Sequence, residues 1–200
     1  GDRRGTNVAN LLAPTEAAQP TRVANALGGR PVIRFSGTNV LQATGLNAFS
    51  GSNYAVIAVV RPTSQSGNLI VRSHTELNVY AAVARTATGY SLLHQPFDQP
   101  QAGAAISGLG SQARVFTPTR LMSPLLKFHR VLARDAGNDT AFDQVVNSTS
   151  PDLGAFSGTL RVGSSGFGGD IAELLVYDRQ VALDEIRDVQ AYLAAKYELD

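Results

Sequence analysis

The C-terminal segment 168–197, GGDIAELLVYDRQVALDEIRDVQAYLAAKY, changes its hydrophobic period partway along. Residues 170–178 are mostly apolar, which is typical of a strand buried on both faces. From Leu183 onward, apolar residues recur three or four positions apart, at 183, 186, 189, 193 and 197, and this spacing forms one stripe of an amphipathic helix. The segment therefore predicts a buried strand, a short turn and a helix over about 183–196. The helix is expected to cover the outside of the fold through Leu183, Ile186, Val189 and Leu193.

The chain before this segment contains short β-type runs separated by Gly, Pro, Ser and Asn. The candidate strands are 31–35, 54–61, 68–73, 77–85, 89–94, 113–117, 127–134, 140–146, 159–163 and 170–178. Many short strands at such spacing predict an all-β, two-sheet antiparallel sandwich with one C-terminal helix. The stretch 95–112, rich in Gly, Gln, Pro and small residues, is predicted to be a long surface loop.

Length and composition favour one domain over residues 1–200. The chain is 44% hydrophobic and has no Cys, so disulfides and thiolate chemistry are excluded. The longest apolar run, 54–60, is strand-sized, and no membrane insertion is expected. Because the chain starts at Gly1 without a leader, we expect a piece processed or excised from a longer protein.

The charge pattern gives no indication of a nucleic-acid partner. The formal net charge is +1, although Lys and Arg outnumber Asp and Glu by 13 to 4 before residue 135 and are outnumbered 4 to 12 from there on. No run interleaves Arg with aromatic residues, as single-strand binders do. Complementary charges within one fold explain the asymmetry better than a polyanion surface does.

Two segments carry a resemblance to a known family. FGGDIAELLVYDRQVALDEIRDVQAYLAAKY (167–197) resembles the closing segment of bacterial concanavalin A-like, laminin-G-like jelly-roll domains, and GRPVIRFSGTNVLQA (29–43) resembles their opening. The resemblance implies two antiparallel sheets, one of them concave, with ligand loops along one rim. Ala182 departs from the family, which usually has a Ser or Thr helix cap there. Without that cap, which is worth ~1 kcal/mol, we expect the helix start to fray.

Enzyme chemistry finds little support in the sequence. Glycoside hydrolases of this fold use two carboxylates facing one cleft, whereas the strand acids Glu76, Asp143 and Glu173 are isolated. Glu173 is interpreted as a structural residue that ties its strand to a neighbouring Arg or backbone N–H. The runs typical of the polysaccharide lyases of this fold are missing, and the three His residues have no metal-ligand spacing. We expect no catalytic residues.

Two loops carry the side chains of a binding site. DAGND (135–139) is interpreted as a β-turn, and its alternative interpretation is a calcium site formed by Asp135, Asn138 and Asp139. The loop 95–101 combines Phe97 with Asp98 and Gln99, an aromatic beside an amide and a carboxylate. The predicted ligand-binding residues are Phe97, Asp98, Gln99, Asn138, Asp139 and Tyr90, with calcium as the one cofactor considered.

The sequence therefore predicts a non-catalytic module that binds carbohydrate or mediates adhesion, located extracellularly, on a cell surface or on a virion surface. The partners would be a glycan or polysaccharide, or proteins of a larger assembly. The alternative is a structural decoration, fibre or capsid-associated domain. A polysaccharide lyase or glycoside hydrolase is the least favoured of the three.

Overall fold

A computed structural model describes residues 10–46, 53–64, 66–74, 79–87, 89–95, 102–107, 114–122, 127–135, 138–147, 158–177 and 179–199. The chain forms two antiparallel sheets, one short 3-10 turn, η1 (Glu16–Ala18), and one α-helix, α1 (Leu183–Lys196). The predicted sandwich and its C-terminal helix are confirmed. The expectations for residues 97–99 lie outside the described residues.

The seven-stranded sheet has the order β1-β2-β13-β4-β9-β10-β11. Its strands are β1 (Thr21–Leu27), β2 (Arg30–Ser36), β13 (Gly168–Tyr177), β4 (Tyr54–Pro62), β9 (Arg114–Met122), β10 (Lys127–Asp135) and β11 (Asn138–Asn147). The C-terminal strand β13 is therefore inserted between β2 and β4, which places the two segments of the family resemblance side by side.

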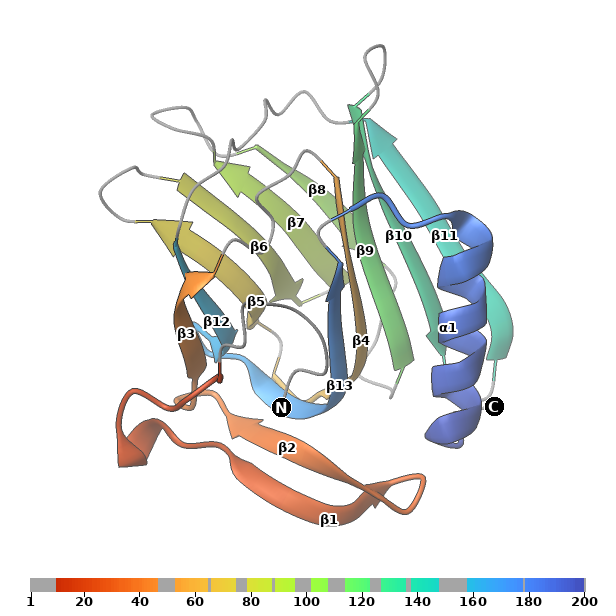
Figure 1. Cartoon of the computed structure of the whole chain (residues 1–200). Helices are drawn as coiled ribbons and strands as arrows, with labels where there is room; N and C mark the ends of the chain where they lie inside the picture. The colour runs from red at the N-terminus through yellow and green to blue at the C-terminus, as the bar shows by residue number, and fades with distance from the viewer. Residues whose placement is uncertain are drawn as a thin grey trace.

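The six-stranded sheet has the order β3-β12-β5-β6-β7-β8. Its strands are β3 (Leu41–Leu46), β12 (Gly158–Ser164), β5 (Gly67–His74), β6 (Val79–Thr86), β7 (Gly89–Gln95) and β8 (Ala102–Ser107). In Figure 1 the two sheets face each other, α1 lies outside the seven-stranded sheet, and β3 lies on the far side of the molecule from α1.

Strand β4 explains the longest apolar run, because it is buried on both faces. Val56, Ala58 and Val60 pack into the core between the sheets. Ile57 and Val59, which alternate with them, pack on the other side against the helix and its C-terminal extension. Successive side chains of a strand point to opposite faces, so a strand covered on both sides must be apolar at nearly every position.

The helix lies where its pattern predicts. Leu193 is fully buried and Ile186 nearly so, while Leu183 and Val189 are partly buried and pack at the edges of the same contact. Val115 of β9 belongs to this layer as well. The strip of apolar residues therefore fixes both the limits of α1 and the sheet on which it packs.

Three strands escaped the sequence prediction, although each of the ten predicted segments overlaps an observed strand. Strand β8, AGAAIS, runs through the stretch that was predicted to be a loop, and this prediction is wrong for 102–107. Its small residues have little intrinsic β preference, and pairing with β7 forms the strand. Strands β1 and β3 lie at sheet edges, where the hydrophobic pattern is weakest.

Candidate functional site

The strands that lead into the two predicted loops end at opposite ends of the sandwich. Strand β7 ends at Gln95, and the antiparallel order of the six-stranded sheet places that end beside the start of β6. Strand β10 ends at Asp135, beside the start of β9 and therefore beside the end of β4. Because β4 continues into the start of β5, the two strand ends are separated by the length of the sheets (Figure 1). Residues 96–101 lie outside the described residues, so the ligand-binding role of Phe97, Asp98 and Gln99 stays a prediction.

The segment 135–139 forms the tip of a hairpin. Asp135 closes β10, Asn138 opens β11, and the two residues pair across the ladder. Asp139 is the second residue of β11. The β-turn interpretation is confirmed by this pairing. The calcium interpretation stays a prediction, because the side chains of these three residues lie outside the described part of the structure.

Tyr90 was predicted to offer a stacking surface to a ligand, and this prediction is wrong. Its side chain is fully buried in the core between the sheets, packed with Leu69, Val83 and Phe167. The guanidinium of Arg85 lies 5.2 Å from the centre of its ring, and Arg85 Nη1 donates to the Gly89 carbonyl at 2.7 Å. Strand β7 directs Tyr90 inward, so no ligand reaches its ring.

The two segments of the family resemblance meet at Asp170. Its carboxylate is 2% exposed and accepts hydrogen bonds from Arg34 on β2, at 2.7 and 3.0 Å. Arg61 on β4 donates to the same carboxylate from the other side, at 2.5 and 3.2 Å. Burial by itself would raise the pKa of Asp170, but the hydrogen bonds and charges of the two arginines outweigh it and hold the pKa below its ordinary value. This ion cluster joins β2, β13 and β4 and is structural.

A second charged group fixes the end of the helix. Lys196 pairs with Glu173 of β13, and the Tyr197 hydroxyl donates to the same carboxylate at 2.8 Å. Burial and this hydrogen bond raise the pKa of Tyr197 above its ordinary range. The interpretation of Glu173 as a residue that ties its strand to a neighbour is confirmed, although its partners are a Lys and a Tyr of the helix end. Arg30 adds a bond from Nε to the Lys196 carbonyl at 2.7 Å.

A bulge in β13 brings the carboxylates of Asp170 and Glu173 to the same face of the sheet. The sequence alone does not show this. The register between β13 and β4 shifts between Ile171 and Glu173, so Glu173 points outward, toward the helix. Asp170 points outward as well, because its neighbour Ile171 packs into the core. If side chains simply alternated along β13, Glu173 would have no second carboxylate on its face. The bulge breaks that alternation. Both carboxylates are nevertheless bound to cations, so neither is available as a general acid or base.

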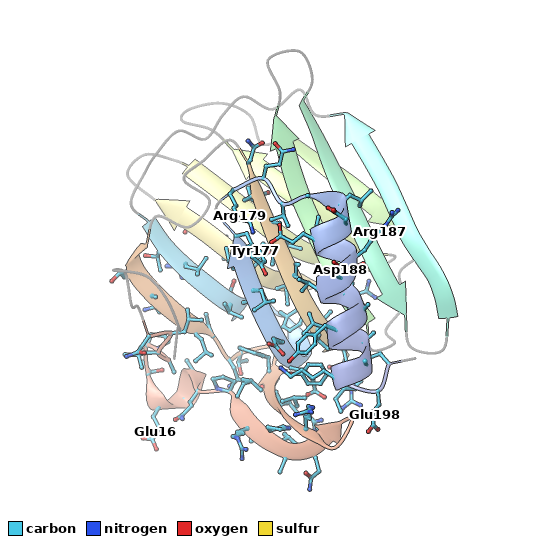
Figure 2. The ribbon with its side chains drawn as sticks, turned by 45° about the vertical axis from the view of Figure 1, so that its right-hand side comes forward. Glu16, Tyr177, Arg179, Arg187, Asp188 and Glu198 are labelled. Atoms are coloured by element: carbon cyan, nitrogen blue, oxygen red, sulfur yellow. The ribbon has the colours of Figure 1, made fainter. Side chains whose placement is uncertain are left out.

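The start of the helix is secured without a capping side chain on Ala182, which makes no side-chain cap bond. Glu185 accepts from the Ala182 N–H, and this bond and its pairing with Arg179 help to hold the pKa of Glu185 below its ordinary value. The Arg179 guanidinium in turn lies 5.3 Å from the Tyr177 ring (Figure 2). Half of a capping box is therefore present, and it offsets part of the missing cap.

The glycines around the end of β12 permit close backbone packing and form no ligand cradle. Gly67 has φ +125°, and a Cβ there would lie 2.1 Å from the Phe167 nitrogen. Gly169 has φ +144°, and its Cβ would lie 2.6 Å from the Arg61 carbonyl oxygen. Ser165 and Gly166 form the turn into β13. The interpretation of this Gly-rich stretch as a turn is confirmed.

A pocket lies on the other side of the molecule, at the edge strand β3. It measures about 290 Å³ and is lined by residues 10–14 and 42–44. An isolated bridge between Leu12 and Gln42 joins the two segments, through backbone bonds of 2.9 and 2.8 Å. Sequence reasoning missed this pocket, because a single long-range bridge between irregular segments leaves no periodic pattern.

Metal and membrane features are few in the part of the chain that the structure describes. That part contains no group of three or more His, Asp and Glu side chains arranged to hold a metal ion. Its helices are all too short or too polar to cross a membrane.

Comparison with known proteins shows which solved structures have a similar fold. No protein-family model matches the sequence, and no curated protein matches it. Among solved structures, domain 4 of AbnA, a GH43 extracellular arabinanase from Geobacillus stearothermophilus solved with arabinotriose, is similar with a TM-score of 0.67 and 13% identity. The match covers 91% of this chain and 87% of that domain.

Binding domains of botulinum neurotoxins are similar as well. The serotype D ligand-binding domain, solved with N-acetylneuraminic acid, has a TM-score of 0.67 at 10% identity, with 92% of this chain and 46% of that chain covered. The serotype DC binding domain, solved with SialylT, has a TM-score of 0.67 at 8% identity, with 92% and 47% covered. This chain spans about half the length of those neurotoxin chains. At such identities the likeness shows a shared β-sandwich fold.

Proposed function

We propose that residues 1–200 form a single non-catalytic glycan-binding module of the concanavalin A-like, laminin-G-like type, carried by an extracellular protein. The observation that carries this proposal is the match to arabinanase domain 4. That match extends over nearly the whole of both chains, and the matched domain was solved with a bound oligosaccharide. The neurotoxin ligand-binding domain, of which 46% is matched, was also solved with a sugar, N-acetylneuraminic acid.

The contacts of Asp170 and Glu173 agree with a binding module and not with a catalytic one. A retaining or inverting glycosidase needs two carboxyl groups that can exchange protons with the substrate. Asp170 is held by two arginines, and Glu173 is held by Lys196 and Tyr197. A carboxylate that is already bound to cations is not positioned to exchange a proton with a substrate.

A glycan array followed by calorimetry tests the proposal. We expect binding to at least one class of oligosaccharide, with affinity unchanged by incubation time because nothing is consumed. Each array should be run with and without calcium, which also tests the predicted site at Asp135, Asn138 and Asp139. Absence of binding to every glycan would contradict the proposed function, and the release of reducing or unsaturated ends would contradict its non-catalytic part.

A further inference from the structure

The pocket at β3 lies on a face of the sandwich that α1 does not cover. Ala43 is buried and faces Leu160 of the core, and Leu41 packs against the same core. Gln42 alternates with them and therefore points outward, away from the core, and Thr44, where the register of β3 begins to shift, is exposed. Leu12 continues this outer surface across the bridge to Gln42 and is 66% exposed. In Figure 1, β3 and α1 lie on opposite sides of the molecule.

The polar side chains of the pocket are not engaged with the rest of the fold. Asn10, Gln42 and Thr44 make no side-chain hydrogen bond to another described residue, and the bridge to Leu12 uses only the backbone of Gln42. Two amides and a hydroxyl supply both donors and acceptors. They can therefore satisfy sugar hydroxyls, which also donate and accept, without any rearrangement of the fold.

The apolar part of the pocket supplies a surface for a sugar ring. Leu12 and Pro14 are exposed aliphatic side chains, and Ala43 of β3 also lines the pocket. Ligand sites combine such apolar walls with a few polar groups that fix orientation. The volume of about 290 Å³ lies just below the usual range of about 300–1,000 Å³, which suits a short segment of a glycan.

The described lining of the pocket carries no charge, because none of the lining residues is acidic or basic. Arg161 pairs with Gln42 across the strands, but its guanidinium extends toward β5, on the other side of β12, where Nη1 donates to the Ser73 hydroxyl at 3.0 Å. An acidic sugar would gain no ion pair from the lining residues and would lose part of its hydration. The lining therefore favours an uncharged ligand.

We infer that this pocket is the subsite of an uncharged sugar, held by Asn10, Gln42 and Thr44 against Leu12 and Pro14. The inference rests on the proposed glycan-binding function and specifies its place and its ligand class. It predicts that the pocket does not prefer sialic acid, and it places the sugar site at β3 and not at the loops 95–101 and 135–139.

Calorimetry on paired variants tests the inference. The probes are neutral oligosaccharides of arabinose, xylose, glucose, mannose and galactose, with sialyllactose and oligogalacturonate as acidic probes. Gln42→Ala should weaken binding of the preferred neutral probe about tenfold, the scale of one lost hydrogen-bonding group, and Asn10→Ala with Gln42→Ala should weaken it further. The matched control is Gln180→Ala, which removes an exposed amide near the start of the helix and should leave the affinity unchanged.

A fluorescence arm reports on the pocket directly. The chain has no Trp, so Leu12→Trp introduces a single Trp at the apolar wall, which can be excited apart from the Tyr residues, and its emission should shift when a neutral probe binds. Neutral binding that is unaffected by the double variant, with no change in Trp emission, would overturn the inference and leave the proposed function standing. Preference for the acidic probes, or affinity that falls steeply with salt, would also overturn it. No binding to any probe would overturn the proposed function and this inference together.

Discussion

The two outer faces of the sandwich are built differently. The outer face of the seven-stranded sheet, called here the closed face, is covered by α1 and fixed by the clusters around Asp170 and Glu173. The outer face of the six-stranded sheet beside β3, called here the open face, carries a pocket whose polar side chains make no hydrogen bond to the side chains or backbone of other described residues. Saturated polar groups stabilise a fold, and unsatisfied exposed ones remain available to a ligand.

Most residues of the two resembling segments lie on the closed face, where 29–43 and 167–197 meet through Arg34 and Asp170. Only the end of the first segment, Gln42 and Ala43, reaches the pocket of the open face. The contacts between the two segments hold a strand and a helix on the sheet. A sequence signature of this kind identifies an architecture, and it gives no information about the ligand.

The largest expected contrast is between two leucines, one on each face. Leu193→Ala empties a fully buried position under α1 and should lower the free energy of unfolding by about 2–5 kcal/mol. Leu12→Ala removes a side chain that is 66% exposed and should change it by no more than about 0.5 kcal/mol. Urea unfolding of the two variants measures both values. Equal losses would mean that the faces do not differ as described.

The ion cluster on the closed face should give a smaller loss that depends on pH. Asp170→Asn removes a buried carboxylate shared by two arginines, and because these are partly exposed we expect a loss of about 1–3 kcal/mol at pH 7. The pKa of Asp170 is lowered in the folded state. Its contribution is therefore complete above the ordinary carboxyl pKa of about 4 and is lost as the pH falls through the lower folded-state pKa.

The difference in stability between wild type and Asp170→Asn, measured by urea unfolding from pH 7 down to pH 2, should therefore shrink only at the acidic end. Asp188→Asn is the matched control, because Asp188 lies on the exposed surface of α1 without a partner among the described residues (Figure 2). It should change stability little at any pH. A constant Asp170→Asn difference across this range would show that the carboxylate charge contributes nothing.

A modest gain in stability is expected from a substitution at the start of α1. Ala182 has the extended backbone of an N-cap, φ −67° and ψ 152°, but no capping side chain. Ala182→Ser should complete the capping box with Glu185 and raise the melting temperature, with a gain of about 0.5–1 kcal/mol. Ala182→Val, which adds a side chain without an acceptor at this exposed position, is the control and should give no gain. No gain from Ser would show that Arg179 and Glu185 already satisfy the helix start.

The smallest expected signal is the absence of turnover. Incubation with arabinan, β-glucans, alginate and chitin oligomers should release no reducing or unsaturated ends, because Asp170 and Glu173, the two acids on the outer face of β13, are bound to cations. Product that disappears in Glu76→Gln, Glu173→Gln or His129→Ala would contradict this expectation and assign the protein to an enzyme class.

The sequence predicted helices and strands well wherever burial produces a regular spacing of apolar residues. The both-sided burial of β4 and the stripe of α1 are local patterns, and both were predicted within a few residues. Strand β8 was missed because AGAAIS has no pattern of its own and is formed by pairing with β7. Tyr90 was assigned to a ligand because sequence shows that a residue is aromatic and does not show which face of its strand is buried.

The sites were harder to predict because they depend on contacts between distant residues. Asp170 meets Arg34 and Arg61 across 136 and 109 positions of the chain. The bulge that turns Glu173 outward depends on the register with β4. The pocket depends on one bridge between Leu12 and Gln42. None of these pairings has a local signal, so they became visible only in the folded chain.

An NMR titration tests the central claim, which is that the closed face stabilises the fold and the open face binds. Uniformly ¹⁵N-labelled protein is titrated with the neutral oligosaccharide that calorimetry ranks first, and the shifted amides are mapped onto the chain. The account predicts that the largest shifts cluster in residues 10–14 and 41–44, with α1 unaffected. Shifts that cluster instead in 183–196, in 95–101 or in 135–139 would contradict it.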